Sequence, residues 1–389
     1  MQAVEVSIIG VGITPVNEHW GKALRELGAD AIDAALDDAG IKREDVDALV
    51  VANALGGCLN KQSNLAALIA DYSGLTGVEA LRVEAAGASG GLAIRQAAMM
   101  VASGAMRNVL VLGVEKVTDM VGPARNNALA TELDAEYESP NGATSTAMAG
   151  ILMRRYMHEF GVELAQFEGF SINAHANGSK NPNAMYRNLI KPGRFASAPI
   201  VAPPVNLFDS APEGDGACAV IVTSSERAGD MVPHPIRIVG GAAASVGFAL
   251  HDRSDPLFLV AANQAAGRAY KVAGVSPQDI DVLELHDAYT VLSAMQLEAI
   301  GFAARGEGWK LAADGAIYAD GALPISTFGG LKARGHAIGA TGVYQVAEVA
   351  MQLRGKAGDN QIADVACGMA LNLGGLGSTA VAHILKRAE

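Results

Sequence analysis

Short apolar runs alternate with amphipathic stretches near the start of the chain. Apolar runs of four to seven residues predict strands, and stretches with apolar residues spaced three and four apart predict helices. The predicted strands are 4–10, 48–52, 81–84 and 108–114, and the predicted helices are 23–38, 64–73 and 92–103. Strands alternating with helices in this way indicate an α/β unit.

The same pattern returns near the end of the chain. A helix closed by Gly40 and followed by a strand matches a helix closed by Gly274, an offset of 234 residues (274 − 40). Small-residue turns at Gly87 and His336 each open a helix, and laid over each other they give an offset of 249 residues (336 − 87). Both repeats predict that the chain is duplicated, with each half built of βαβ units.

The two small-residue turns are the places where we expect chemistry. The stretch 83–91 runs from a strand end through Gly and Ala into a helix, and 335–342 does the same. Such a turn directs backbone N–H groups and the positive end of the helix dipole at one point, which favours anions. We expect both helices to be buried and to start near each other.

The middle of the chain breaks the alternation. Pro and Asn residues punctuate two predicted helices, 147–160 and 164–179, and an excursion of this length usually caps a functional site. We expect it to fold over the first half. The predicted division is an N-terminal half of 1–117 with 211–232, an inserted domain of 118–210 and a C-terminal half of 233–389.

Composition narrows the class of protein. At 389 residues, with 50% hydrophobic and 18% charged residues, the chain can build more than one core. A net charge of −12, with basic residues scattered among acidic ones, argues against a nucleic-acid surface. Without an apolar run long enough for a membrane span or a leading signal segment, we expect a cytoplasmic protein. The three cysteines, Cys58, Cys218 and Cys367, predict neither a disulfide framework nor a metal site.

Four motifs carry a family resemblance. Residues 335–342 (GHAIGATG), 286–289 (HDAY), 372–375 (NLGG) and the turn 85–91 (AAGASGG) resemble the thiolase superfamily. The similarity is closest to the branch of sterol carrier protein and archaeal acetyl-CoA acetyltransferases. The resemblance implies a layered αβαβα fold with two mixed five-stranded sheets and an inserted loop domain that covers CoA. It also implies CoA thioesters as substrates, no covalently bound cofactor, a homodimer or dimer of dimers, and in this branch a small OB-fold, zinc-ribbon partner.

The candidate site residues follow from the motifs. His336 opens a helix between glycines, where the helix N-terminus should keep its imidazole neutral and able to donate a hydrogen bond to a thioester oxygen. His286 ends a buried strand, where α/β sheets place reactive groups, and Tyr289 is a possible accessory. Asn372 and Gly374 lie in a predicted turn whose N–H groups would complete an oxyanion hole. By the resemblance, Asn372 stands where better-known thiolases carry an acid/base cysteine.

One position departs from the family pattern. The resemblance places the nucleophilic cysteine at position 87, and Gly87 has no side chain to acylate. The first hypothesis is therefore an enzyme that forms or cleaves C–C bonds through an enolate, such as an aldolase acting on β-hydroxyacyl-CoA. The alternatives are a non-catalytic acyl-CoA-binding subunit and an acyltransferase with Cys58 as a surrogate nucleophile. Since the helix N-terminus is retained, the sequence also predicts that cysteine at position 87 would become acylated.

Overall fold

The first sheet contains five strands. The computed structural model describes residues 5–388, so the predicted strand start at residue 4 lies outside them. Parallel pairing joins β2 to β3 and β4, whereas β7 pairs antiparallel with β4 and β1, so the sheet is mixed. The order is β3-β2-β4-β7-β1, with bounds β1 Val6–Ile13, β2 Ala48–Ala52, β3 Glu79–Val83, β4 Asn108–Glu115 and β7 Gly216–Ser224.

The second sheet continues from the first. Two residue pairs between β1 and β8 join the halves into one nine-stranded order that ends β8-β11-β10-β9. Within the described residues this half has four regular strands where five are expected, and an isolated bridge joins Leu283 of β9 to Ile325. The bounds are β8 Ile236–Ser245, β9 Val282–Glu284, β10 Cys367–Gly374 and β11 Thr379–Arg387.

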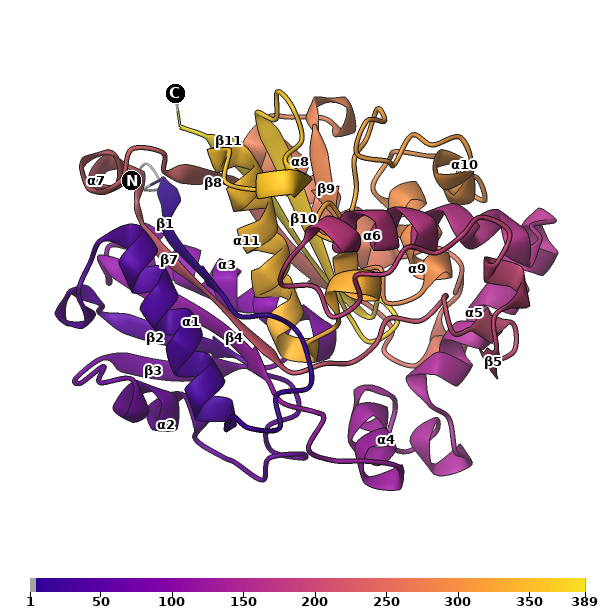
Figure 1. The fold of residues 1–389 in the computed structure, drawn as a ribbon, viewed down its shortest axis with the longest axis horizontal. Helices are drawn as coiled ribbons and strands as arrows, with labels where there is room; N and C mark the ends of the chain where they lie inside the picture. The colour runs from indigo at the N-terminus through magenta and orange to yellow at the C-terminus, as the bar shows by residue number, and fades with distance from the viewer. Residues whose placement is uncertain (1–4, 389) are drawn as a thin grey trace.

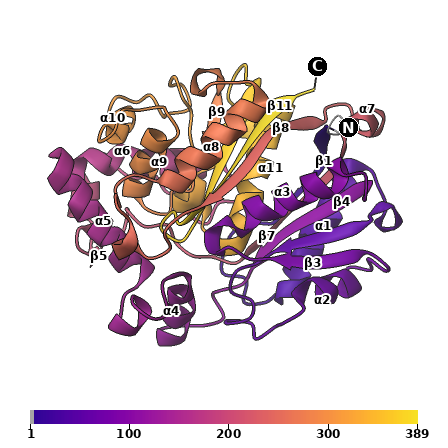
Figure 2. The same ribbon diagram turned by 180° about the vertical axis from the view of Figure 1, so that it is seen from behind.

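Helices cover both outer faces and fill the space between the two halves of the sheet (Figures 1 and 2). α1 (Leu24–Ala39) and α2 (Leu65–Tyr72) pack on the outer face of the first half, and α8 (Val260–Ala273) on that of the second. α3 (Ser89–Ala102) and α11 (Thr341–Arg354) contact each other and share one buried apolar cluster with strands of both halves. The layers are those of the αβαβα fold that the family resemblance implies.

The duplication is present, but one of its two registers needs correction. Gly40 and Gly274 both end their helices in the left-handed conformation, as the 234-residue offset requires. The second offset is 252 residues and not 249, because the turn Ala86–Ala88 matches Ile338–Ala340 (338 − 86). Ala86 and Ile338 both have positive φ, 49° and 25°. Gly87 is therefore the counterpart of Gly339, and the pairing of Gly87 with His336 is wrong.

Most of the inserted segment packs against the second half of the chain. It contains α4 (Pro123–Leu129), α5 (Ser145–Phe160), α6 (Glu168–Lys180) and the short strands β5 (Ile200–Ala202) and β6 (Val205–Asn206). Side chains of α5 and α6 join the apolar cluster of the second half, where they meet α9 (Thr290–Ala299) and α10 (Gly308–Ala313) (Figure 1). The expectation that this segment folds over the first half holds only for α4, whose Ala128 and Leu129 share an apolar cluster with Leu55 and Leu59 of the first half, whereas α5 and α6 pack against the second half. Remaining helical elements include α7 (Ser225–Met231).

Among residues 5–388, no helix combines the length and the apolar character needed to cross a membrane.

The crossing of α3 and α11 depends on glycine. A Cβ at Gly90 would lie 2.5 Å from the backbone nitrogen of Val343, so Gly90→Ala should lower the free energy of unfolding by about 1–3 kcal/mol. Gly267→Ala is the matched control, because Gly267 lies in α8 with no atom near its Cβ position and should gain about 0.5–1 kcal/mol. Urea denaturation of both variants measures the difference, and equal stabilities would contradict the close crossing.

Candidate active site

The turn at Gly87 is enclosed by neighbouring atoms. β3 leads through Glu84 and Ala85 into the 3-10 turn Ala86–Ala88, and α3 follows. A Cβ at position 87 would lie 2.6 Å from the carbonyl oxygen of Leu373 and 2.7 Å from Cε1 of His286. Both distances are shorter than real side-chain contacts. The expectation that a cysteine here would simply become acylated is therefore not supported, because the backbone of β10 or the ring of His286 would have to move.

Two histidine rings meet beside this turn. His286 follows β9, and His336 precedes the 3-10 turn Ile338–Ala340 that leads into α11. The ring centroids are 5.2 Å apart and the rings are nearly perpendicular. Nδ1 of His336 lies 2.7 Å from the hydroxyl of Thr341, so the opposite nitrogen is the one available to a ligand. The structure thus brings Gly87, His286 and His336 together.

Asn372 lies in strand β10 and not in the predicted turn, which corrects its expected role. The backbone N–H of Gly91 donates to its Oδ1 at 3.0 Å, and this fixes the orientation of the amide. The amide nitrogen consequently faces Nδ1 of His286 at 3.3 Å and the Oε1 of Gln345 at 2.9 Å. Since Asn372 donates, Nδ1 of His286 accepts and Nε2 carries the hydrogen. Nε2 lies on the side of the ring that faces Gly87.

Burial keeps both imidazoles neutral. Burial, together with the nearby Arg334 guanidinium, lowers the pKa of His286 to about 3. The pKa of His336 is well below its usual range for the same reason, with His286 and Arg334 as additional causes. The direction agrees with the prediction for His336, although desolvation and not the helix N-terminus is its main cause. Arg334 is itself buried, paired with Glu348 at 2.7 Å and stacked over the ring of Tyr344.

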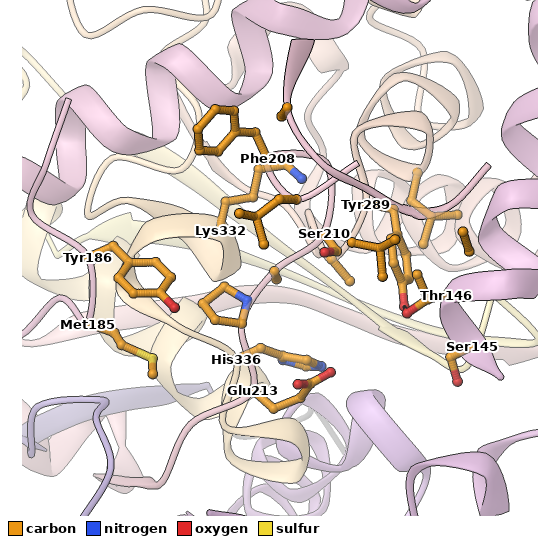
Figure 3. Close-up of a pocket in the computed structure, with 18 of the residues that line it drawn as sticks. Ser145, Thr146, Met185, Tyr186, Phe208, Ser210, Glu213, Tyr289, Lys332 and His336 are labelled. Atoms are coloured by element: carbon orange, nitrogen blue, oxygen red, sulfur yellow. Dashed lines mark hydrogen bonds between the residues drawn. The ribbon is translucent and has the colours of Figure 1, made fainter. Parts of the chain in front are cut away.

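A cavity of about 1180 Å³ is lined by both His286 and His336. Figure 3 shows His336 in its wall. Tyr289 lines it, and its hydroxyl lies 3.0 Å from that of Thr146 on α5. Gly374 does not line the cavity, because it ends β10 in close contact with the carbonyl of Ala85, whereas Gly375 does. Cys58 is exposed on a loop and is not among the lining residues.

The rim of the cavity combines basic and apolar side chains. Arg125, Lys191 and Arg194 line it, all three on the inserted segment. Large apolar side chains at the same opening are exposed, namely Tyr186, Leu189, Val201 and Leu207. An opening of this kind suits a ligand with both phosphate and apolar parts.

Two family profiles cover most of the chain. The profile described as "Thiolase, N-terminal domain" matches residues 6–197, and "Thiolase C-terminal domain-like" matches residues 242–387. This chain belongs to the thiolase superfamily. It is 41% identical to an acetyl-CoA acetyltransferase of Methanothermobacter thermautotrophicus over 98% of this chain and 100% of that protein. It is 30% identical to a steroid side-chain-cleaving aldolase of Thermomonospora curvata, over 92% of each chain.

A solved structure agrees with this assignment. The thiolase chain superposes on a structure titled "Ltp2-ChsH2(DUF35) aldolase" with a TM-score of 0.86, 28% identity and coverage of 98% of this chain and 97% of that one. Its relatives therefore include both acyltransferases and aldolases. Membership of this family supports chemistry on CoA thioesters. It does not determine the type of reaction, which must be inferred from the residues of the site.

Two buried charged residues near this site, Glu115 and Arg334, were not predicted from the sequence. Glu115 ends β4, is buried, and accepts backbone hydrogen bonds from Ala54, Leu55 and Gly339, while burial raises its pKa to about 7. It holds the turn at Gly339 as Asn372 holds the start of α3. Nothing in the local sequence marks Glu115, since a strand-ending glutamate is usually exposed. The only sequence feature that could have indicated Arg334 is its position two residues before His336.

Buried histidines make the stability of the fold depend on pH. His286 and His383 both have a pKa lowered to about 3 by burial, so between pH 6.5 and 3 the unfolded chain binds protons that the folded chain does not. The contribution of each histidine to stability is therefore largest well above pH 6.5 and falls with acidification, by about 1.4 kcal/mol per histidine at pH 5.5. Buried carboxyls with a raised pKa, such as Glu115, contribute in the opposite direction. His383→Gln should remove one histidine's share of this loss. Denaturation curves at pH 8 and 5.5 test it, and an unchanged pH dependence would contradict it.

Proposed function

We propose that this thiolase-fold protein forms or cleaves C–C bonds of CoA thioesters through an enolate, without an acyl-enzyme at position 87. The reaction that fits best is retro-aldol cleavage of a β-hydroxyacyl-CoA to an acyl-CoA and a carbonyl compound, or its reverse. The proposal rests on the turn at Gly87. The neutral imidazoles of His286 and His336 lie beside this turn, and a side chain at position 87 would clash with its neighbours.

The two histidines supply the oxyanion site in this proposal. Nε2–H of His286 and the outward nitrogen of His336 donate to the thioester oxygen, which gains negative charge as the enolate forms. Neutral imidazoles suit this task, since their depressed pKa values keep them from becoming charged near pH 7. Asn372 maintains the tautomer of His286 and does not contact the substrate.

CoA binds as substrate and not as a covalently attached cofactor. Its phosphates would meet Arg125, Lys191 and Arg194 at the rim, and its pantetheine arm would follow the apolar opening toward His336. Surrogate catalysis by Cys58 is disfavoured, because this thiol does not line the cavity. If the protein binds acyl-CoA but shows no activity, the alternative of a non-catalytic acyl-CoA-binding subunit is favoured.

The assembly belongs to the same proposal. β3 is the terminal strand of the sheet, and its free edge suits pairing with a second copy in a homodimer. A small DUF35 partner is proposed because the similar aldolase structure is titled as a complex with ChsH2(DUF35). Size-exclusion chromatography with light scattering tests the dimer.

The activity itself is tested with β-hydroxyacyl-CoA substrates. Cleavage should release acyl-CoA and a carbonyl compound, both detectable by chromatography and mass spectrometry. His336→Ala should reduce the rate by roughly 10²–10³-fold, as expected for loss of one oxyanion donor. His251→Ala, an exposed histidine outside the cavity lining, is the control and should leave the rate unchanged. A wild-type protein that binds CoA but cleaves none of the substrates would contradict the proposal.

A further inference from the structure

Glu213 stands directly opposite His336 in the cavity wall. The two residues form an isolated parallel bridge, in which His336 N–H donates to the carbonyl of Pro212 at 2.8 Å and Gly214 N–H donates to that of His336 at 3.1 Å. These bonds on either side of Glu213 fix its backbone. Its carboxyl lines the cavity, and Figure 3 shows it beside the His336 ring. A carboxyl group is thus built into the wall next to the oxyanion site.

The short segment that carries Glu213 also contacts the other catalytic motif. Ala211 N–H donates to the carbonyl of Ala288 at 2.8 Å, and Ser210 forms a bridge with Tyr289. The segment 210–214 is therefore hydrogen-bonded both to residues 288–289, beside His286, and to His336. This anchoring leaves its backbone little freedom to carry the carboxyl away from the site.

The surroundings of Glu213 are those of a proton carrier. Burial raises its pKa, and Arg125 opposes that shift. Glu132 faces the same cavity, and burial together with the charge of Glu213 raises the pKa of Glu132 to about 7. Titratable side chains that line the same cavity also include His175, His286, Tyr289, Lys332 and His336. Two carboxyls in one cavity favour states in which one of them holds a proton near neutral pH.

We propose that Glu213 is the acid/base group of this site, an inference that rests on the proposed enolate function. In the cleavage direction its carboxylate takes the hydrogen of the β-hydroxyl group, the C–O bond becomes C=O, and the Cα–Cβ bond breaks. The electron pair of that bond forms the enolate held by the two histidines. After the carbonyl product leaves, Glu213 returns the proton to Cα, so one carboxyl balances the whole reaction.

Four other titratable groups in the cavity suit this task less well. His286 and His336 are poor bases, since burial depresses the pKa of both imidazoles. Burial raises the pKa of Tyr289 well above its usual value, which makes its phenolate inaccessible near pH 7. Glu132 accepts a hydrogen bond from Ser145 and is held on the opposite segment. Glu213 is the carboxyl adjacent to the oxyanion donors.

Two variants of Glu213 test the proposal on the full-length protein. Glu213→Gln keeps the shape and removes the base, so kcat for cleavage should fall by roughly 10²–10⁴-fold with KM and melting temperature unchanged. Glu213→Ala should be equally slow but should regain activity with added formate or acetate, and not with formamide. Glu226→Gln, which removes an exposed carboxyl on α7 outside the cavity lining, is the control and should leave kcat unchanged.

The outcomes separate this inference from the proposed function. If wild type cleaves the substrate and Glu213→Gln cleaves it equally fast, Glu213 is not the acid/base group although the enolate function stands. Rescue of Glu213→Ala by formamide as well as formate would likewise overturn it, because that pattern indicates filling of space. A wild-type protein that neither cleaves nor exchanges α-hydrogens removes the proposed function and this inference together.

Discussion

Asn372→Asp should reduce the rate of enolate formation by roughly 10²–10³-fold, the effect of losing one oxyanion donor, while the fold is kept. The Gly91 N–H can still donate to one carboxylate oxygen, but the other oxygen now faces Nδ1 of His286. Because a carboxylate only accepts hydrogen bonds, the hydrogen of the imidazole must move from Nε2 to Nδ1. Nε2 then has no hydrogen to donate to the thioester oxygen.

The tautomer can be observed directly. Nitrogen NMR of the His286 ring should show hydrogen on Nε2 in the wild type and on Nδ1 in Asn372→Asp. Gln345→Glu is the matched control, since it places a carboxylate in the same buried network, where it still accepts from Asn372. It should cost stability and leave the His286 tautomer unchanged. Wild-type activity in Asn372→Asp, or hydrogen on Nδ1 in the wild type, would contradict the role assigned to Asn372.

Gly87→Cys should neither restore an acyl-enzyme nor preserve the oxyanion site. Its Cβ would lie 2.6 Å from the carbonyl oxygen of Leu373, a backbone atom, and 2.7 Å from the His286 ring. Relieving these contacts should cost about 1–3 kcal/mol of stability and displace His286. Gly87→Ala introduces the same Cβ without a thiol and should lose activity and stability to the same extent. We expect cleavage activity to fall in both variants.

Intact-mass measurement with labelled acetyl-CoA distinguishes the possibilities for Gly87→Cys. The predicted result is a protein mass without an acyl group, together with a lowered melting temperature. A stable Gly87→Cys protein that becomes stoichiometrically acylated would show that the glycine is a simple replacement in an intact thiolase site. Loss of activity in Gly87→Cys alone, with Gly87→Ala unaffected, would locate the effect in the sulfur and not in the close packing.

The two α/β halves could be predicted because periodic apolar patterns and helix-ending glycines are local features, whereas the layered arrangement was implied by the family resemblance. Gly40 and Gly274 end equivalent helices, and this alone fixes one register of the duplication. The second register was missed because sequence similarity aligned Gly87 with His336, whereas the backbone aligns Ala86 with Ile338 through their positive φ. A positive φ at an alanine or an isoleucine cannot be predicted from the residue type, because these residues rarely adopt it.

The candidate site was predictable only in part. His336 was found because it lies in a glycine-rich motif that opens a helix, and His286 because it ends a buried strand. Glu213 was missed because its place beside His336 depends on a bridge between segments more than 100 residues apart in sequence. Asn372 was found, but its function depends on which neighbour its amide oxygen faces, and only the contact with Gly91 determines that.

Exchange of the α-hydrogens of acetyl-CoA in deuterated water, followed together with the intact mass of the protein, tests the central claim most directly. Enolate formation without an acyl-enzyme predicts that deuterium enters the methyl group of acetyl-CoA, that His336→Ala slows this exchange, and that the protein mass stays unchanged. A wild-type protein that gains an acyl group, with no deuterium entering acetyl-CoA, would contradict the account.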